Sequence, residues 1–223
     1  MMKVSKELCE FTGAIIGDGN LWTDGSRYRV EIAGDTRLDL TYFLHLSKIA
    51  YNLFKKHPYK FRVKGNQLYF RLQSKYAFNI LNKGLGIFAG RGKSRTVIIP
   101  KSIIKKGWRY SKWALRGIMD TDGTLFFSRK TYKKAIYPSI EIRTFSRNLG
   151  IQVNGLLWRN GFRSHLRGNE DRGYSIGIYG ETMLRKWVRE IGFSNQRHGY
   201  KYLAHKAILA ESAAVAQPGR ASR

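Results

Sequence analysis

Two aspartates, Asp18 and Asp122, occupy the same place in two copies of a nine-residue pattern and are the residues best suited to chemistry. The copies read Phe11-Thr-Gly-Ala-Ile-Ile-Gly-Asp-Gly19 and Leu115-Arg-Gly-Ile-Met-Asp-Thr-Asp-Gly123. Each is an apolar helical segment that ends at Asp-Gly, and two such helices packed together would bring both carboxylates close to one another. Neighbouring carboxylates repel unless they share a proton or bind cations, and Mg²⁺ is the natural cation because it takes oxygen ligands.

Glycines within these segments predict that the two helices cross closely. Gly13 and Gly17 in the first copy and Gly117 in the second remove side chains where helices can approach each other. Each Asp-Gly pair on its own could merely cap a turn, but the repetition favours the paired-carboxylate interpretation. Asp120 has no acidic counterpart in the first copy, where Ile16 stands, so we interpret it as structural.

Both copies continue with the same order of elements, which predicts an α+β fold. Two pseudo-symmetric units are expected, each with the order helix, two strands, helix, two strands, helix (αββαββα) and an antiparallel sheet. In the first unit we expect a helix over 6–17, strands over 20–24 and 27–33, a helix from an N-cap at Thr36 to about Phe54, and strands over 59–64 and 67–73. In the second unit we expect a first helix over 111–121 and a longer hairpin loop near 130–136. The predicted domains are residues 1–99 and 111–211, with a connector over 100–110 and a flexible tail over 212–223.

The predicted strands have one apolar face and one polar, mostly cationic face. In the strand over 27–33, for example, Val30 and Ile32 share one face while Arg29 and Glu31 share the other. The apolar face would pack on helices, as in antiparallel sheets that are covered on one side. An ordinary solvated face mixes both charge signs, so the cationic excess favours contact with DNA or RNA.

The overall charge supports a polyanionic partner. The chain has 41 Lys and Arg against 15 Asp and Glu, a formal net charge of +26. A basic ribosomal or membrane-surface protein is the alternative, but the cations are spread along the chain, which favours a folded binding surface. The single cysteine excludes an intramolecular disulfide and a Cys-rich zinc site. Without a long apolar run or a signal-like start, we expect a soluble intracellular protein, in the cytoplasm of a prokaryote or within an organelle.

The two segments resemble the LAGLIDADG motif, which names a family of homing endonucleases, RNA maturases and a few DNA-binding regulators. The resemblance extends from about residue 8 to residue 210, and it departs from the motif at Phe11, Thr12, Ile16 and Arg116. It implies a saddle of antiparallel sheets on double-stranded DNA and cleavage of both strands at one long target. Because both motif copies are present in one chain, the protein is expected to work as a monomer without any membrane association.

The resemblance also implies the site residues. Asp18 and Asp122, with the residues that precede them, Gly17 and Thr121, are the expected metal-binding residues. Mg²⁺ is the expected cofactor, with Mn²⁺ as an alternative and Ca²⁺ as a non-productive substitute. The family places a basic residue near each metal centre, for which the catalytic candidates are Lys93 and Arg197, or Lys201 in place of Arg197. Each could instead be one more phosphate contact. We interpret His198 as a packing residue rather than a general base.

Sheets of this kind can lie along the major groove, where Arg and Gln read guanine and adenine edges. The residues expected to face DNA are Arg27, Arg29, Glu31, Lys60, Arg62, Lys64, Arg71 and Gln73 in the first copy, and Ser139, Glu141, Arg143, Arg163, His165, Arg167 and Tyr179 in the second. Two other functions stay open from the sequence: an RNA maturase that helps its host intron fold, and a non-catalytic DNA-binding regulator. Loss of Asp18 or Asp122 would favour one of these two functions, but both aspartates are present.

Overall fold

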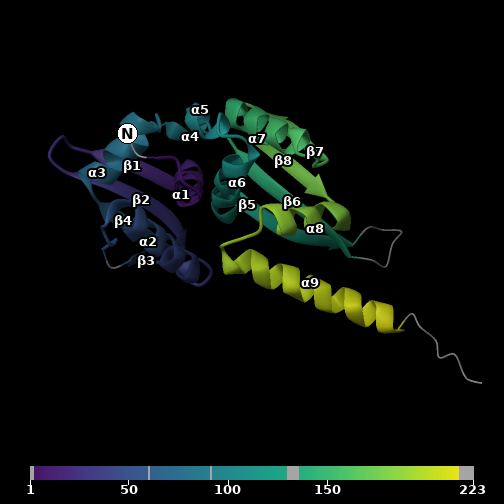
Figure 1. Cartoon of the computed structure of the whole chain (residues 1–223). Coiled ribbons are helices and arrows are strands. Elements are labelled where there is room, and N and C mark those ends of the chain that lie inside the picture. Colours follow the sequence, from purple (N-terminus) through teal and green to yellow (C-terminus); the bar gives the residue numbers. More distant parts are fainter. Residues whose placement is uncertain (1–2, 60, 91, 130–135, 216–223) are drawn as a thin grey trace, which may run out of the picture.

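The computed structural model describes residues 3–59, 61–90, 92–129 and 136–215. Its first unit is a four-stranded antiparallel sheet with the strand order β1-β2-β4-β3 and helices packed on one face (Figure 1). The elements of this unit are α1 (Lys6–Ile16), β1 (Gly19–Thr23), β2 (Tyr28–Asp35), α2 (Leu40–Phe54), β3 (Arg62–Lys64), β4 (Gln67–Gln73) and α3 (Lys75–Asn79), which continues as a π-helical turn over Ile80–Gly84.

The second unit repeats this arrangement. Its sheet has the order β5-β6-β8-β7, which is the same order as in the first unit. Its elements are α6 (Trp108–Asp122), β5 (Gly123–Arg129), β6 (Ile136–Thr144), α7 (Arg147–Arg159), β7 (Ser164–Asn169), β8 (Gly173–Tyr179) and α8 (Glu181–Glu190). Two short helices, α4 (Lys93–Thr96) and α5 (Lys101–Ile104), join the units, and a long helix, α9 (Gln196–Val215), follows the second. The predicted α+β fold of two αββαββα units is confirmed.

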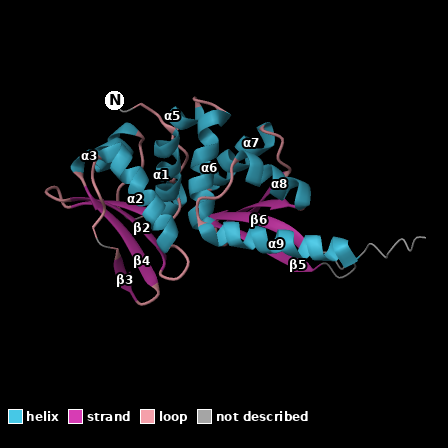
Figure 2. Ribbon diagram, turned by 60° about the horizontal axis from the view of Figure 1, so that its bottom comes forward, coloured by secondary structure: helices cyan, strands magenta, loops and turns pink. Residues whose placement is uncertain are grey.

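The central helices α1 and α6 lie side by side between the two sheets (Figure 2). A Cβ atom on Gly13 would lie 2.2 Å from the carbonyl oxygen of Ala114, and one on Gly117 would lie 2.2 Å from that of Glu10. The backbones are therefore in direct contact, as the glycines predicted, and any side chain at either position would push the helices apart. Helix α6 begins at Trp108, three residues before the predicted start.

The second long helix of the first unit begins later than predicted. The prediction placed its N-cap at Thr36, but α2 begins at Leu40 with Asp39 as N-cap. The reason is a turn at Asp35, whose carboxylate accepts hydrogen bonds from the backbone N–H groups of Arg37 (2.8 Å) and Leu38 (3.1 Å). Such turns compete with helix initiation, because the side chain satisfies the same N–H groups that a helix would use.

Each unit has its own apolar core, and the chain enters the second core before residue 100. Val97, Ile99 and Ile103 are buried with the residues of the second unit rather than the first. The interior apolar residues of each sheet alternate as predicted, with Val30 and Ile32 buried in the first unit. Strand β3 is shorter than the predicted strand over 59–64.

Helix α9 covers part of the second unit along β5, and it corrects the predicted tail. The tail was expected from residue 212, but the helix extends to Val215, since Ser-Ala-Ala-Val contains good helix formers. Residues 216–223 and most of the predicted loop near 130–136 lie outside the described residues. No helix within the described ranges is both long and apolar enough to cross a membrane.

Candidate metal centre and nucleic-acid interface

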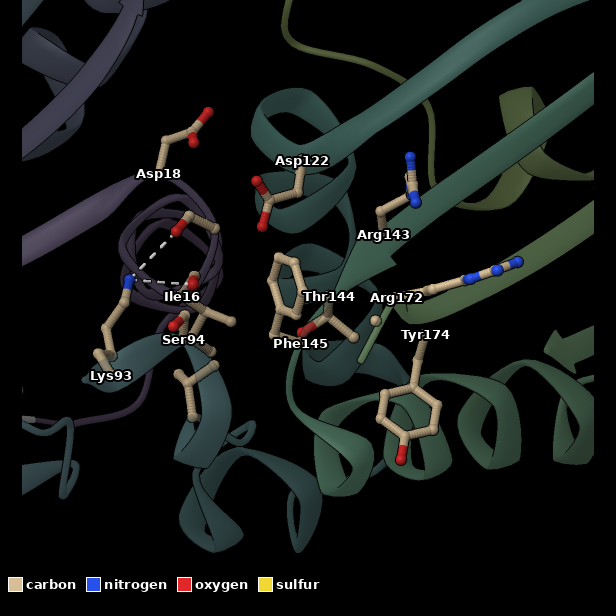
Figure 3. A pocket seen from close by; sticks show the side chains of 13 residues that line it. Ile16, Asp18, Lys93, Ser94, Asp122, Arg143, Thr144, Phe145, Arg172 and Tyr174 are labelled. Carbon is tan, nitrogen blue, oxygen red and sulfur yellow. Dashed lines mark hydrogen bonds between the residues drawn. The ribbon is translucent and has the colours of Figure 1, made fainter. Parts of the chain in front are cut away.

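The ends of α1 and α6 bring Asp18 and Asp122 together (Figure 3). The two carboxyls lie close enough for each to shift the pKa of the other. Burial raises the pKa of both groups, and the charge of Asp18 raises that of Asp122 further. Both side chains line a cavity of about 450 Å³ that also contacts Lys93 and Arg143. The site is thus a pair of neighbouring carboxyls at the wall of a cavity, with Asp18 exposed and Asp122 half-buried.

Lys93 lies against the C-terminal end of α1. Its Nζ donates hydrogen bonds to the backbone oxygens of Ile16 (3.0 Å), Gly17 (3.1 Å) and Gly19 (2.5 Å), and it also contacts that of Ile15. A cation here balances the partial negative charge of the helix end. Burial lowers the pKa of Lys93 to about 8, although the two nearby aspartates oppose this shift.

Arg197 has the equivalent position at the end of α6. Its Nη2 donates to the backbone oxygens of Asp120 (3.1 Å) and Thr121 (2.7 Å). The alternative, Lys201, is exposed on α9. His198 is buried and packs against Phe193, with ring centroids 5.3 Å apart and ring planes tilted by 40°. Burial lowers the pKa of His198 to about 3, so the ring is neutral, which suits a packing role.

The residues that precede the two acids offer backbone oxygens. Those of Gly17 and Thr121 already accept hydrogen bonds from Lys93 and Arg197, and the Thr121 hydroxyl donates to the Gly117 oxygen (2.9 Å) inside α6. Asp120 is buried behind the site, where its carboxylate accepts from the Ser194 N–H (2.8 Å).

A divalent cation fits this donor set. Two adjacent carboxyls whose pKa values are raised would lose their protons more readily beside a cation, and carboxylate and carbonyl oxygens suit Mg²⁺. The described residues contain no group of three or more His, Cys, Asp or Glu side chains that could hold a metal. The protein alone would therefore supply few ligands, and substrate oxygens and water would complete the coordination.

The predicted DNA-facing residues of the first unit share the sheet face opposite the helices. Glu31 on β2 lies opposite Arg71 on β4 and forms an ion pair with it, and Arg29 lies opposite Gln73. The same face includes Arg62 and Lys64 on β3, and Arg27 lies in the β1–β2 turn, paired with Asp24. Lys60 lies outside the described residues.

The second sheet has an equivalent polar face. Ser139 lies opposite Tyr179, Glu141 opposite Gly177, and Arg167 opposite Ser175. Arg167 donates a hydrogen bond to the Tyr179 hydroxyl. This face has a hollow of about 650 Å³, whose wall is lined by Ser139, Arg163, His165, Arg167, Tyr179, Phe126, Ser128 and Tyr137. Arg143, the remaining predicted residue, lines the cavity of the acid pair.

Several residues on the same faces were missed by the sequence interpretation. Trp22 on β1 lies opposite Arg29, and its ring is 4.8 Å from the Arg29 guanidinium carbon. Asn20, Tyr69 and Phe126 lie on these faces by strand alternation. The same alternation, applied to β1 and β5 as well as to the central strands, would have identified them.

Similar solved structures share this architecture. No protein-family model matches the chain, and no curated protein matches its sequence. The homing endonuclease I-DmoI, in complex with DNA and Mn, superimposes with a TM-score of 0.60 at 20% identity and covers 85% of this chain and 98% of its own. The LAGLIDADG homing endonuclease I-LtrWI, bound to target DNA, gives 0.59 at 12% identity and covers 94% of this chain and 92% of its own.

A third structure, the LAGLIDADG homing endonuclease I-GzeII in complex with its DNA target, gives a TM-score of 0.57 at 10% identity. It covers 96% of this chain and 94% of its own. At these identities the likeness concerns the backbone rather than individual side chains. From the paired central helices, the two sheets of matching strand order and these superpositions, we conclude that the chain has the fold of the LAGLIDADG homing endonucleases.

Proposed function

We propose that this protein is a site-specific endonuclease that hydrolyses both strands of double-stranded DNA at one long target. The proposal rests above all on the position of Asp18 and Asp122, which form an acid pair at the ends of α1 and α6, between two polar sheet faces rich in Arg. It is supported by similar structures that contain target DNA with Mn, Mg or Ca. We infer that the protein acts as a monomer on duplex DNA.

Some of the chain's residues would bind the duplex, and others would take part in its hydrolysis. The sheet faces place the duplex across the ends of α1 and α6 through phosphate and base contacts. Asp18 and Asp122 would hold divalent ions, with the backbone oxygens of Gly17 and Thr121 nearby. When bound, Mg²⁺ supplies Lewis acidity that activates water and stabilises the leaving oxygen. Lys93 and Arg197 fix the helix ends and keep positive charge beside the phosphates.

The test begins with a target. Duplexes from a randomised library are selected for binding in Ca²⁺, and the selected duplex is then incubated in Mg²⁺. We expect cuts on both strands at fixed positions. Asp18→Asn and Asp122→Asn should lose cleavage by orders of magnitude while retaining binding in Ca²⁺, because the amide keeps the size but not the charge.

The matched control is Asp120→Asn, which alters an acid close to the pair that does not line the cavity. Cleavage by both Asn variants of the acid pair at the parent rate would show the assignment to be wrong. Binding of duplex without any cleavage by the parent protein would indicate a regulator, and binding of structured RNA in preference to duplex would indicate a maturase.

A further inference from the structure

Asp39 of the first unit reaches the segment of the second unit that carries Arg197. Asp39 is buried, with an exposed fraction of 5%. Its Oδ1 accepts a hydrogen bond from Asn195 Nδ2 (2.7 Å) and lies 3.3 Å from Arg197 Nη1. Its Oδ2 accepts from the Asp35 N–H (2.7 Å). The carboxylate therefore connects the two units at the side of the acid pair.

The side chain of Asp39 does not serve its own helix. Although Asp39 is the N-cap residue of α2, it makes no side-chain cap hydrogen bond there. Asn195, which it holds, also donates to the backbone oxygen of Asp120 (3.0 Å). The carboxylate is thus directed toward the neighbouring unit, and stabilisation of α2 does not explain its orientation.

These contacts fix the orientation of the Arg197 guanidinium. Nη1 faces Asp39, and Nη2 donates to the backbone oxygens of Asp120 and Thr121. Because a guanidinium is planar, two anchors on different nitrogens define both its position and its plane. Without Asp39, the contacts of Nη2 to the end of α6 and that of Nε to His198 Nε2 (3.3 Å) would remain, and Nη1 would lose its anchor on the first unit.

The other basic residue is held differently. Ser146, which precedes α7 as Asp39 precedes α2, donates from Oγ to the backbone oxygen of Val97 (2.7 Å), close to Lys93 in sequence. Both contacts run from the start of the second long helix of a unit to the segment that carries a basic residue. Only Asp39 contacts the basic side chain itself, and only Asp39 is charged.

We propose that Asp39 is a positioning residue that holds Arg197 at the end of α6 from the opposite unit, and that its loss slows cutting of one DNA strand in preference to the other. The proposal rests on the proposed endonuclease function for its effect on cleavage. The strand bias follows because Lys93, at the end of α1, is positioned without Asp39.

The first experiment measures both strands separately. The selected duplex carries a different fluorophore on each 5′ end, and single-turnover rates are measured for the parent, Asp39→Asn and Ser146→Ala. We expect Asp39→Asn to slow one strand about tenfold more than the other, which corresponds to ~1.4 kcal/mol of activation free energy. Ser146→Ala, the matched control, removes the contact to the segment that carries Lys93 and should not produce this bias.

The second experiment tests whether the effect acts through Arg197. In an Arg197→Ala background, Asp39→Asn should produce no further strand bias, because the group that it positions is gone. A general weakening of the contact between the units would persist in that background. Equal slowing of both strands by Asp39→Asn, or a bias that survives Arg197→Ala, would overturn the proposal.

A readout without metal, DNA or cleavage separates this inference from the proposed function. In ¹⁵N-labelled protein, Asp39→Asn should shift or broaden the Arg197 Nε–H resonance. The Nε–H of Arg116, which donates to the Ile191 oxygen (2.6 Å), should not change and serves as internal control. An unchanged Arg197 resonance would overturn the positioning role. If the parent protein cuts no DNA, the endonuclease proposal fails, and this resonance still decides whether Asp39 holds Arg197.

Discussion

Substitution of Gly117 by alanine tests the helix crossing on which the acid pair depends. The new Cβ would lie 2.2 Å from the Glu10 oxygen and 2.7 Å from the Ala14 nitrogen, whereas ordinary contacts begin at 3.4 Å. Both neighbours are backbone atoms of α1, so no side-chain rotation relieves the contact, and the helices must separate by roughly 1 Å. Overpacking costs ~1–3 kcal/mol, and rigid backbone neighbours place this case at the upper end.

The helix propensity of alanine partly offsets this cost. Ala is favoured over Gly in a helix by ~1 kcal/mol, so the expected net loss in the free energy of unfolding is about 2 kcal/mol. Urea unfolding followed by circular dichroism measures it. Gly199→Ala in α9 is the control, because a Cβ there meets nothing within 4 Å and should stabilise the protein by ~0.5–1 kcal/mol. A Gly117→Ala protein as stable as the parent would refute the close crossing.

Other predictions concern charge, salt and reactivity. In metal-free buffer Asp122→Asn should change how the free energy of unfolding depends on pH between about 4 and 7. The pKa of Asp122 is raised to about 7, so the folded state keeps a proton there that the unfolded chain releases, and this group contributes a loss of stability as pH rises. The parent should therefore lose stability over this range relative to the Asp122→Asn protein in urea titrations, and equal slopes would count against the raised pKa of Asp122. Duplex affinity should drop steeply between about 50 and 200 mM salt, and a flat response in gel shifts would contradict extensive phosphate contact. Cys9 is buried and its pKa is raised to about 12, so thiol reagents should label it only after unfolding, and rapid labelling of the native protein would contradict the packing of α1. Sedimentation should give the mass of one chain, 25.7 kDa, and a stable dimer would oppose the monomer.

The parts of this fold that the sequence predicted are those set by local periodicity. The glycines of α1 and α6 and the alternation of Val30 and Ile32 depend only on neighbours along one helix or strand. The acid pair was predicted because the motif occurs twice and each copy ends in the same way. Lys93 and Arg197 were identified from the resemblance, and both lie at helix ends in the structure.

The contacts between units could not be predicted in this way. Asp39 and Asn195 are far apart in the sequence, and each lies in a segment without periodicity. Their contact exists only because α1 and α6 cross where they do, so it is a property of the assembled units. The start of α2 was missed for a more local reason, since Asp35 forms a turn with the residues that follow it and the N-cap position moves from Thr36 to Asp39.

The two halves of the site share a backbone arrangement but not a distribution of charge. Lys93 is a buried amine whose pKa is lowered to about 8, whereas the basic residue of the other centre, Arg197, is a guanidinium. The positive charge of Arg197 lowers the pKa of Asp18 more than the charge of Lys93 does. For Asp122, the charge of Lys93 has the larger effect. A dimer of one repeated unit would have to use the same basic residue and the same anchor at both centres. Because a single chain encodes both units, Asp39 can contact the basic residue of one centre while Ser146 contacts the segment that carries the basic residue of the other. A substitution can therefore alter one centre without changing the other.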